Sequence, residues 1–258
     1  MDMTEPISSW GLIFNAAKAG GAIIDDKKRM ELTKKLLLLV RKKRKIVIFG
    51  ISGAGKSQFI NSLKRNIIVA ERTFMTDRVK HELEDFPIEF IDTPGQNGRT
   101  YERQQEINNI IKDGVEGIIN VSSFGYEENP EIPLANIFTP KGEVKDSHLR
   151  LNRKEELKRL AEWLPLIQPA NIGWIINLIN KGDLWWSEIS EVDKYYGEGD
   201  YFKAFESITK YTHILNLPYC SIIKPYYNMS TCGKFGDIQK EQMHNHLIHQ
   251  LLNLLKED

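Results

Sequence analysis

Short apolar runs of the buried-strand type alternate along this chain with longer segments of helical spacing. The runs predict strands at 45–50, 77–84, 86–91, 116–122, 172–179 and roughly 219–223. The longer segments predict helices at 56–65, 101–112, 152–164, 200–213 and 237–256. The second strand passes into the third through Glu84 and Asp85, so these two strands should form an antiparallel hairpin at the sheet edge. The order predicts an α/β fold of three layers, with a six-stranded, mostly parallel sheet between two layers of helices.

Two segments fall outside this alternation. Residues 1–44 carry apolar positions at loose helical spacing and predict a mainly helical N-terminal extension ahead of an α/β domain at 45–258. Residues 124–150 contain Pro130, Pro133 and Pro140 and predict a long irregular insertion within that domain. Loops of this length in a compact domain are more often functional than accidental. Both segments are therefore candidate recognition surfaces.

The first predicted strand runs into a glycine-rich loop that suits a chain of phosphates. The loop and the residue after it read Gly50-Ile51-Ser52-Gly53-Ala54-Gly55-Lys56-Ser57-Gln58. Its glycines let the backbone wrap phosphates closely, and its N–H groups with the following helix N-terminus stabilise negative charge. Lys56 should reach the β- and γ-phosphates, and the Ser57 hydroxyl should bind Mg²⁺. A glycine-rich turn without a ligand is the alternative, which the strand before it and the helix after it disfavour. The predicted nucleotide-binding residues here are Gly50, Ser52, Gly53, Ala54, Gly55, Lys56, Ser57 and Gln58.

A second phosphate element follows the third predicted strand, where the chain reads Asp92-Thr93-Pro94-Gly95. An acidic residue at the carboxyl end of a strand beside a phosphate loop can hold Mg²⁺, usually through water, so Asp92 is a predicted metal residue. The Gly95 N–H can sense a γ-phosphate, and the loop after it would then change with nucleotide state. A plain Pro-Gly turn is the alternative. The position directly after an apolar strand argues against it.

The third element, Asn180-Lys181-Gly182-Asp183, follows the apolar strand at 172–179. The Asp183 carboxylate can accept both the N1–H and the exocyclic amine of guanine, whereas adenine would leave these buried acceptors unpaired. Lys181 should lie along the base plane, and Asn180 should tie the loops together. A tetrapeptide is weak evidence alone. Its place after two phosphate elements predicts guanine recognition and disfavours an ATPase or a kinase.

Together GISGAGKS, DTPG and NKGD resemble the motifs of Ras-like P-loop GTPases of the translation-factor-related class, over roughly 45–256. The resemblance implies a P-loop GTPase fold with a six-stranded mixed sheet, GTP or GDP with Mg²⁺ as ligand, and attack of water on the γ-phosphate. Gln96 directly follows DTPG, where Ras-type members place the glutamine that orients the attacking water. The alternative is an exposed polar residue on a loop.

Two further family elements leave alternatives open. The threonine that closes over Mg²⁺ and the γ-phosphate should lie between the phosphate loop and the hairpin, where Thr73 and Thr76 both qualify. The loop that supports guanine after the last strand should resemble Ser-Ala-Lys. This chain offers Cys220–Lys224 or, further on, Ser230-Thr231.

Composition excludes several other classes of function. With 35 basic and 35 acidic residues the net charge is +0, so nothing in the charge balance indicates nucleic-acid binding. The two cysteines have neither a zinc-ligand spacing nor a disulfide pattern, and a reducing cytoplasm is the expected location. No apolar run near the N-terminus is long enough to span a membrane, and no signal-peptide pattern precedes it. The basic run Arg41–Lys45 suggests a peripheral contact of the N-terminal extension with anionic lipid, or simply a solvated lead-in to the first strand.

The sequence therefore predicts a cytoplasmic, GTP-hydrolysing switch that is slow without a protein effector or activator. Its predicted catalytic residues are Lys56, Gln96, Thr73 and Thr76, and Thr76 also joins Ser57 and Asp92 as a metal residue. The alternative is a GTP-dependent assembly or membrane-associated module with little intrinsic hydrolysis.

Overall fold

A six-stranded sheet forms the middle layer of the computed structural model. The structure describes residues 44–63, 79–82, 88–92, 100–112, 114–167, 172–205, 212–228 and 235–255. The strands are β1 Arg44–Gly50, β2 Val79–Glu82, β3 Ile88–Asp92, β4 Gly117–Ser122, β5 Trp174–Ile179 and β6 His213–Pro218. Their spatial order is β2-β3-β1-β4-β5-β6. Only β2 runs antiparallel to its neighbour, β3, among the strand pairs described, so the predicted α/β fold with an edge hairpin is confirmed.

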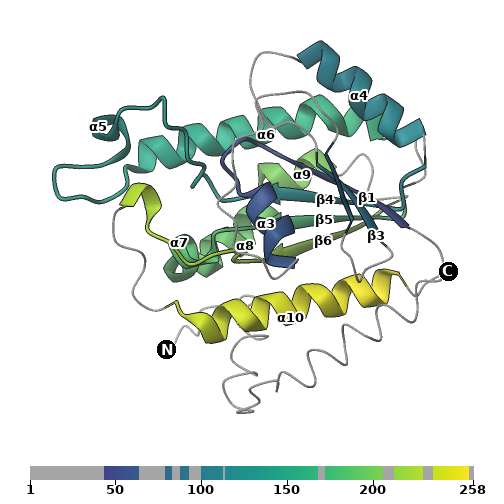
Figure 1. Ribbon diagram of the computed structural model, residues 1–258. Helices are drawn as coiled ribbons and strands as arrows, with labels where there is room; N and C mark the ends of the chain where they lie inside the picture. Colours follow the sequence, from purple (N-terminus) through teal and green to yellow (C-terminus); the bar gives the residue numbers. More distant parts are fainter. Residues whose placement is uncertain are drawn as a thin grey trace, which may run out of the picture.

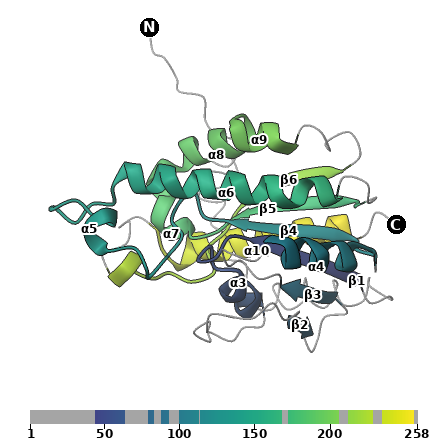
Figure 2. The same cartoon turned by 90° about the horizontal axis from the view of Figure 1, so that it is seen from above.

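Helices cover both faces of this sheet (Figures 1 and 2). They are α3 Lys56–Leu63, α4 Thr100–Lys112, α5 Leu134–Ile137, α6 Asp146–Ile167, α7 Gly182–Trp185, α8 Ile189–Gly197, α9 Asp200–Phe205 and α10 Asp237–Leu254, with short 3₁₀ turns η1 Trp186–Glu188 and η2 Tyr226–Asn228. Helices α3 and α10 lie on one face, and α6, with α4 and α9 packed beside it, lies on the other. In the part of the chain that the structure describes, no helix is long and apolar enough to cross a bilayer.

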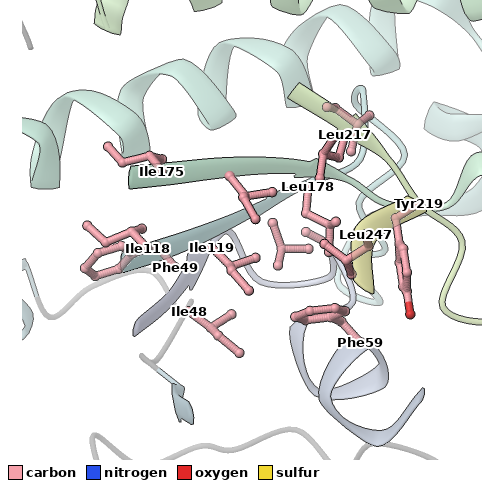
Figure 3. Close-up of a cluster of buried hydrophobic side chains, with 14 of the residues drawn as sticks. Ile48, Phe49, Phe59, Ile118, Ile119, Ile175, Leu178, Leu217, Tyr219 and Leu247 are labelled. Atoms are coloured by element: carbon pink, nitrogen blue, oxygen red, sulfur yellow. The ribbon is translucent and has the colours of Figure 1, made fainter. Parts of the chain in front are cut away.

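The central strands β1, β4 and β5 are buried on both faces, as their continuous apolar runs predict. Alternate residues serve alternate layers, because successive side chains of a strand point to opposite faces. Ile48 and Ile119 lie toward Phe59 of α3 and Leu247 of α10 (Figure 3). On the other face the ring of Phe49 stacks on Trp163 of α6 with 4.6 Å between ring centroids.

A row of three asparagines crosses the sheet on the α6 face. Asn120, Asn177 and Asn216 occupy paired positions on β4, β5 and β6. The amide of Asn177 donates to Asn216 at 2.9 Å and accepts from Asn120 at 3.3 Å, and Asn216 donates to the carbonyl of Tyr196 in α8 at 3.0 Å. The buried side chains of Asn120 and Asn177 and the half-buried side chain of Asn216 are therefore hydrogen-bonded to one another, and we call this row the amide ladder.

The last strand was predicted wrongly. Strand β6 is His213–Pro218, not 219–223. Of the predicted helix 200–213, the structure describes Asp200–Phe205 as α9, residues 206–211 lie outside the described residues, and His213 belongs to β6. Strand β6 lies at the sheet edge, so its outer residues stay partly exposed and its apolar signal is weak. Pro218 is tolerated at its end, because an edge strand has a side without ladder bonds.

Helix α6 begins at Asp146, six residues before the predicted start at 152. An acidic side chain stabilises the first turn of a helix, and Asp146 also pairs with Arg150 and Arg153 of that helix. The segment predicted as an irregular insertion at 124–150 therefore ends in helix. It also contains α5 and an isolated bridge between Phe138 and Val144. The predicted N-terminal extension lies outside the described residues, except that Arg44 already belongs to β1.

Candidate functional site

The glycine-rich loop lies between the carboxyl end of β1 and the start of α3, as predicted. Lys56 is 8% exposed, and its Nζ donates to the carbonyls of Gly50 at 2.9 Å and Ile51 at 3.3 Å. The loop therefore curls around the ammonium group. Ser57 follows in the first turn of α3, and its backbone is placed where a helix N-terminus favours anions.

Gly53 of this loop has φ +84°, a conformation that L side chains rarely adopt. A Cβ at that position would lie 2.5 Å from the carbonyl oxygen of Glu128 and 2.7 Å from its nitrogen. The backbone of the segment after β4 therefore lies directly on the phosphate loop. Only a residue without a side chain permits this approach.

The structure describes only some of the residues predicted to bind magnesium or to sense the γ-phosphate. Asp92 ends β3 and pairs in register with Ile48, so its backbone lies at the same sheet edge as the phosphate loop. The predicted positions Thr73, Thr76, Gly95 and Gln96 lie outside the described residues. Their roles remain predictions.

Asn180 joins the phosphate loop to the loop after β6. Its Nδ2 donates to the carbonyl of Ala54 at 3.0 Å, and its Oδ1 accepts from both the backbone N–H and the hydroxyl of Ser221 at 3.0 Å. Its own carbonyl accepts from the indole Nε1 of the buried Trp185 at 2.7 Å. A single buried amide thus fixes the relative position of three segments far apart in the sequence.

Asp183, the predicted guanine-reading residue, is 2% exposed beside the same loop. The backbone N–H of Lys224 donates to its Oδ2 at 3.1 Å, and the thiol of Cys220 donates to its Oδ1 at 3.4 Å. Burial raises the pKa of the Asp183 carboxyl, and the two hydrogen bonds oppose that rise. Of the two alternatives left open for a guanine-supporting loop, the structure brings Cys220–Lys224 to Asp183, whereas Ser230-Thr231 lies outside the described residues.

Lys181 adopts a left-handed backbone, with φ 60° and ψ 39°. Its Nζ donates to the carbonyl of Tyr126 at 2.6 Å and lies 5.6 Å from the ring centroid of Tyr226. Burial lowers the pKa of the Lys181 ammonium to about 8. Lys181 also lines a shallow hollow beside the loop Cys220–Lys224. The hollow is lined by Gln58, Asn180, Lys181, Asp183, Leu184, Ser221, Ile222 and Lys224.

The carboxyl groups of Glu127 and Glu156 are both buried and both contact Ser123, the first residue after β4. Glu156 of α6 accepts from the backbone N–H of Ser123 at 2.7 Å and from the hydroxyl of Tyr196 at 2.9 Å. Ser123 donates its hydroxyl to Glu127 at 2.8 Å. Burial and the neighbouring Glu127 raise the pKa of Glu156 well above its ordinary value. Within the described ranges, no group of three or more His, Cys, Asp or Glu residues is arranged to hold a metal ion.

Sequence reasoning missed three residues that complete the site from outside the motifs. They are Tyr126, Glu128 and Tyr226. The loop at 220–224 was one of the two alternatives that the sequence offered for the guanine-supporting loop. Nothing local in the sequence marks the segment at 126–128.

Residues 45–160 match the family model described as 50S ribosome-binding GTPase. The matched range includes the phosphate loop and Asp92–Gly95 but ends before Asn180–Asp183. No curated protein sequence matches the chain significantly.

Three solved structures are similar to the chain. The ADP-ribosylation factor-like GTP-binding protein, small COPII coat GTPase SAR1, of Encephalitozoon cuniculi in complex with GDP has 15% identity and a TM-score of 0.48, over 93% of this chain and 94% of that chain. The Arl6 BBS3 small GTPase of Trypanosoma brucei with bound GppNp has 12% identity and a TM-score of 0.45, over 82% and 98%. The mammalian SRP receptor has 14% identity and a TM-score of 0.46, over 82% and 100%. Similarity at this level carries no functional argument, so the family match is the comparison that bears on function.

Proposed function

We propose that this chain, whose residues 45–160 match a GTPase family model, binds GTP and GDP with Mg²⁺, hydrolyses GTP and acts as a nucleotide-dependent switch. The observation that supports this most directly is the position of Asn180. Its side chain joins Ala54 of the phosphate loop to Ser221, and Ser221 lines the same hollow as the Asp183 carboxylate. Phosphate-binding and base-reading groups therefore belong to one continuous site.

The residues available for Mg²⁺ fit that ion. Ser57 begins the helix after the phosphate loop, and Asp92 ends the strand beside β1. Mg²⁺ usually takes one or two protein oxygens and completes its shell with water and substrate phosphates, so two oxygen donors at one sheet edge are enough. When bound, the ion would neutralise charge that develops on the β- and γ-phosphates.

The chain's own residues would bind the phosphates, select the base and position the attacking water. Lys56 and the loop N–H groups bind the phosphates, and Asp183 selects guanine through two accepted hydrogen bonds. Gln96 orients the attacking water, and Thr73 or Thr76 closes over the γ-phosphate. Hydrolysis is slow until a protein partner completes the site, because transition-state charge in this chemistry is commonly stabilised by an arginine that a partner can supply.

Asp183→Asn tests base selection. The substituted amide donates where the carboxylate accepted, so GDP affinity should fall and affinity for xanthosine diphosphate, which has a carbonyl in place of the amine, should rise. Isothermal calorimetry with GDP, xanthosine diphosphate and ADP measures the change. Equal affinity of the unmodified chain for ADP and GDP would overturn the guanine assignment.

Gln96→Ala tests the catalytic proposal. We expect single-turnover GTP hydrolysis to slow by about tenfold or more, because a positioned water is lost, while GDP affinity stays unchanged. An unchanged hydrolysis rate would remove Gln96 from the mechanism. A chain that binds GTP tightly without measurable turnover would instead favour an assembly or membrane-associated module with little intrinsic hydrolysis.

A further inference from the structure

The proposed nucleotide site has a phosphate half, which is the loop after β1, and a base-reading half, which is formed by the segments after β5 and β6. The segment Tyr126–Asn129, here called the clasp, contacts both halves. Its contact with the phosphate half is the close approach of the Glu128 backbone to Gly53, where even a Cβ would collide. The clasp therefore rests on the loop that would hold the phosphates. It follows β4 without a helix between, so the end of the central sheet fixes its start.

Every residue of the clasp is also hydrogen-bonded to the base-reading half. Lys181 Nζ donates to the carbonyl of Tyr126 at 2.6 Å, and the hydroxyl of Tyr226 donates to the carbonyl of Glu127 at 2.9 Å. Lys224 Nζ pairs with Glu128 Oε2 at 2.7 Å, and the hydroxyl of Tyr227 donates to the carbonyl of Asn129 at 3.0 Å. Four consecutive residues thus tie the phosphate side to the base side.

Backbone strain is concentrated at the same place. Across the described ranges, the non-glycine residues with positive φ are Phe124 at 55°, Lys181 at 60° and Tyr227 at 46°. Phe124 lies two residues before the clasp, and the other two donate hydrogen bonds to it. Such conformations persist only where the surrounding structure fixes them, and they gather at ligand clamps and switch regions.

Lys224 makes the connection that reaches the predicted guanine contact. Its backbone N–H donates to Asp183 Oδ2 at 3.1 Å while its ammonium group pairs with Glu128. The two paired side chains are 33% and 27% exposed, so solvent reaches the ion pair and can compete with it. The loop that orients the Asp183 carboxylate is therefore held at Lys224 by a contact that solvent can weaken.

We propose that Glu128 and Lys224 are positioning residues that retain guanine nucleotide, because their ion pair couples the phosphate loop to the orientation of Asp183. GDP leaves at an appreciable rate only when the pair opens. A partner that binds either residue would then accelerate exchange without touching the nucleotide. The inference rests on the proposed function, since it concerns retention of the nucleotide assigned to that site.

The test measures dissociation of a fluorescent GDP analogue from the full chain, chased with excess GDP. Lys224→Met and Glu128→Gln should each raise the dissociation rate by about two- to fivefold, the range expected for a partly exposed ion pair. The double variant should dissociate no faster than the faster single variant, because both changes remove one interaction. Lys224→Arg should keep the slow rate. Lys203→Met is the matched control, since Lys203 pairs with Asp200 at 3.2 Å on the exposed surface of α9.

A readout of base preference separates positioning from a general loss of structure. Lys224→Met should lower the preference for GDP over inosine diphosphate, which lacks the exocyclic amine, and should leave the melting temperature of the nucleotide-free chain unchanged. Additive rate increases, unchanged rates or an unaltered base preference would each overturn the inference. If the unmodified chain fails to bind the analogue at all, the proposed function itself is wrong, and the two failures are thereby distinguished.

Discussion

Buried charge distinguishes the residues of this site from ordinary surface groups. Lys181 is enclosed between Tyr126 and Tyr226, and Asp183 receives a thiol and a backbone N–H. Burial acts against the charged form of both groups, which is a common property of residues that meet a ligand. The sequence alone identified these two positions, because a short motif after an apolar strand specifies them.

The remaining contacts of the site were not predictable residue by residue. Cys220 and Lys224 meet Asp183 across 37 and 41 positions of sequence, and Lys224 meets Glu128 across 96. No local pattern records such a meeting, because it is set by where β4, β5 and β6 end. A cysteine in place of the expected serine further weakens the signal, although both side chains can donate to a carboxylate.

Lys181 provides a prediction on the dependence of stability on pH. The pKa of its ammonium is about 8 in the folded chain against an ordinary 10.5. Between these values the unfolded chain holds a proton that the folded chain has released, so stability rises with pH in this window. The melting temperature of the nucleotide-free chain, minus that of Lys181→Met, should therefore increase from pH 7 to pH 9.5. A difference that stays constant with pH would contradict the burial of a charged Lys181.

At the scale of elements, the strands that are buried on both faces were the easiest to predict. Strands β1, β4 and β5 form continuous apolar runs, whereas the edge strand β6 has partly exposed residues and a terminal proline. The predicted helix 200–213 is described over Asp200–Phe205 as α9, and its last residue, His213, belongs to β6 instead.

Helix α6 is attached to the sheet through Trp163, which stacks on Phe49 and meets Phe205 of α9 edge-on. Trp163→Ala should destabilise the chain by about 3–5 kcal/mol, because it removes a large buried ring and leaves a cavity. Urea unfolding monitored by circular dichroism measures this loss. Leu151→Ala on the same helix is the control, since Leu151 is 57% exposed and its truncation should cost less than about 0.5 kcal/mol. Equal losses for the two variants would show that α6 does not pack on β1 as described.

For the whole molecule, binding and folding should be linked through Asn180. A ligand that binds only the folded chain raises its stability, by about 2.7 kcal/mol at a hundred times the Kd. GDP with Mg²⁺ should therefore raise the melting temperature, and ADP should not. Asn180→Ala should abolish most of the GDP-dependent rise, because the phosphate loop and Ser221 lose their common partner. A full GDP-dependent rise in this variant would mean that the two loops are held together by other contacts.

The amide ladder also bears on how the loops after β4, β5 and β6 are aligned at the site. Asn120, Asn177 and Asn216 each lie two residues before the end of their strand, at Ser122, Ile179 and Pro218. A slip of one residue between neighbouring strands would break the ladder, turn the side chains to the opposite face and move a strand end by about 3.3 Å. The loops that begin at Ser123, Asn180 and Tyr219 therefore start level with one another. Three hydrogen-bonded asparagines thus mark the alignment of β4, β5 and β6 on which recognition at the sheet edge depends.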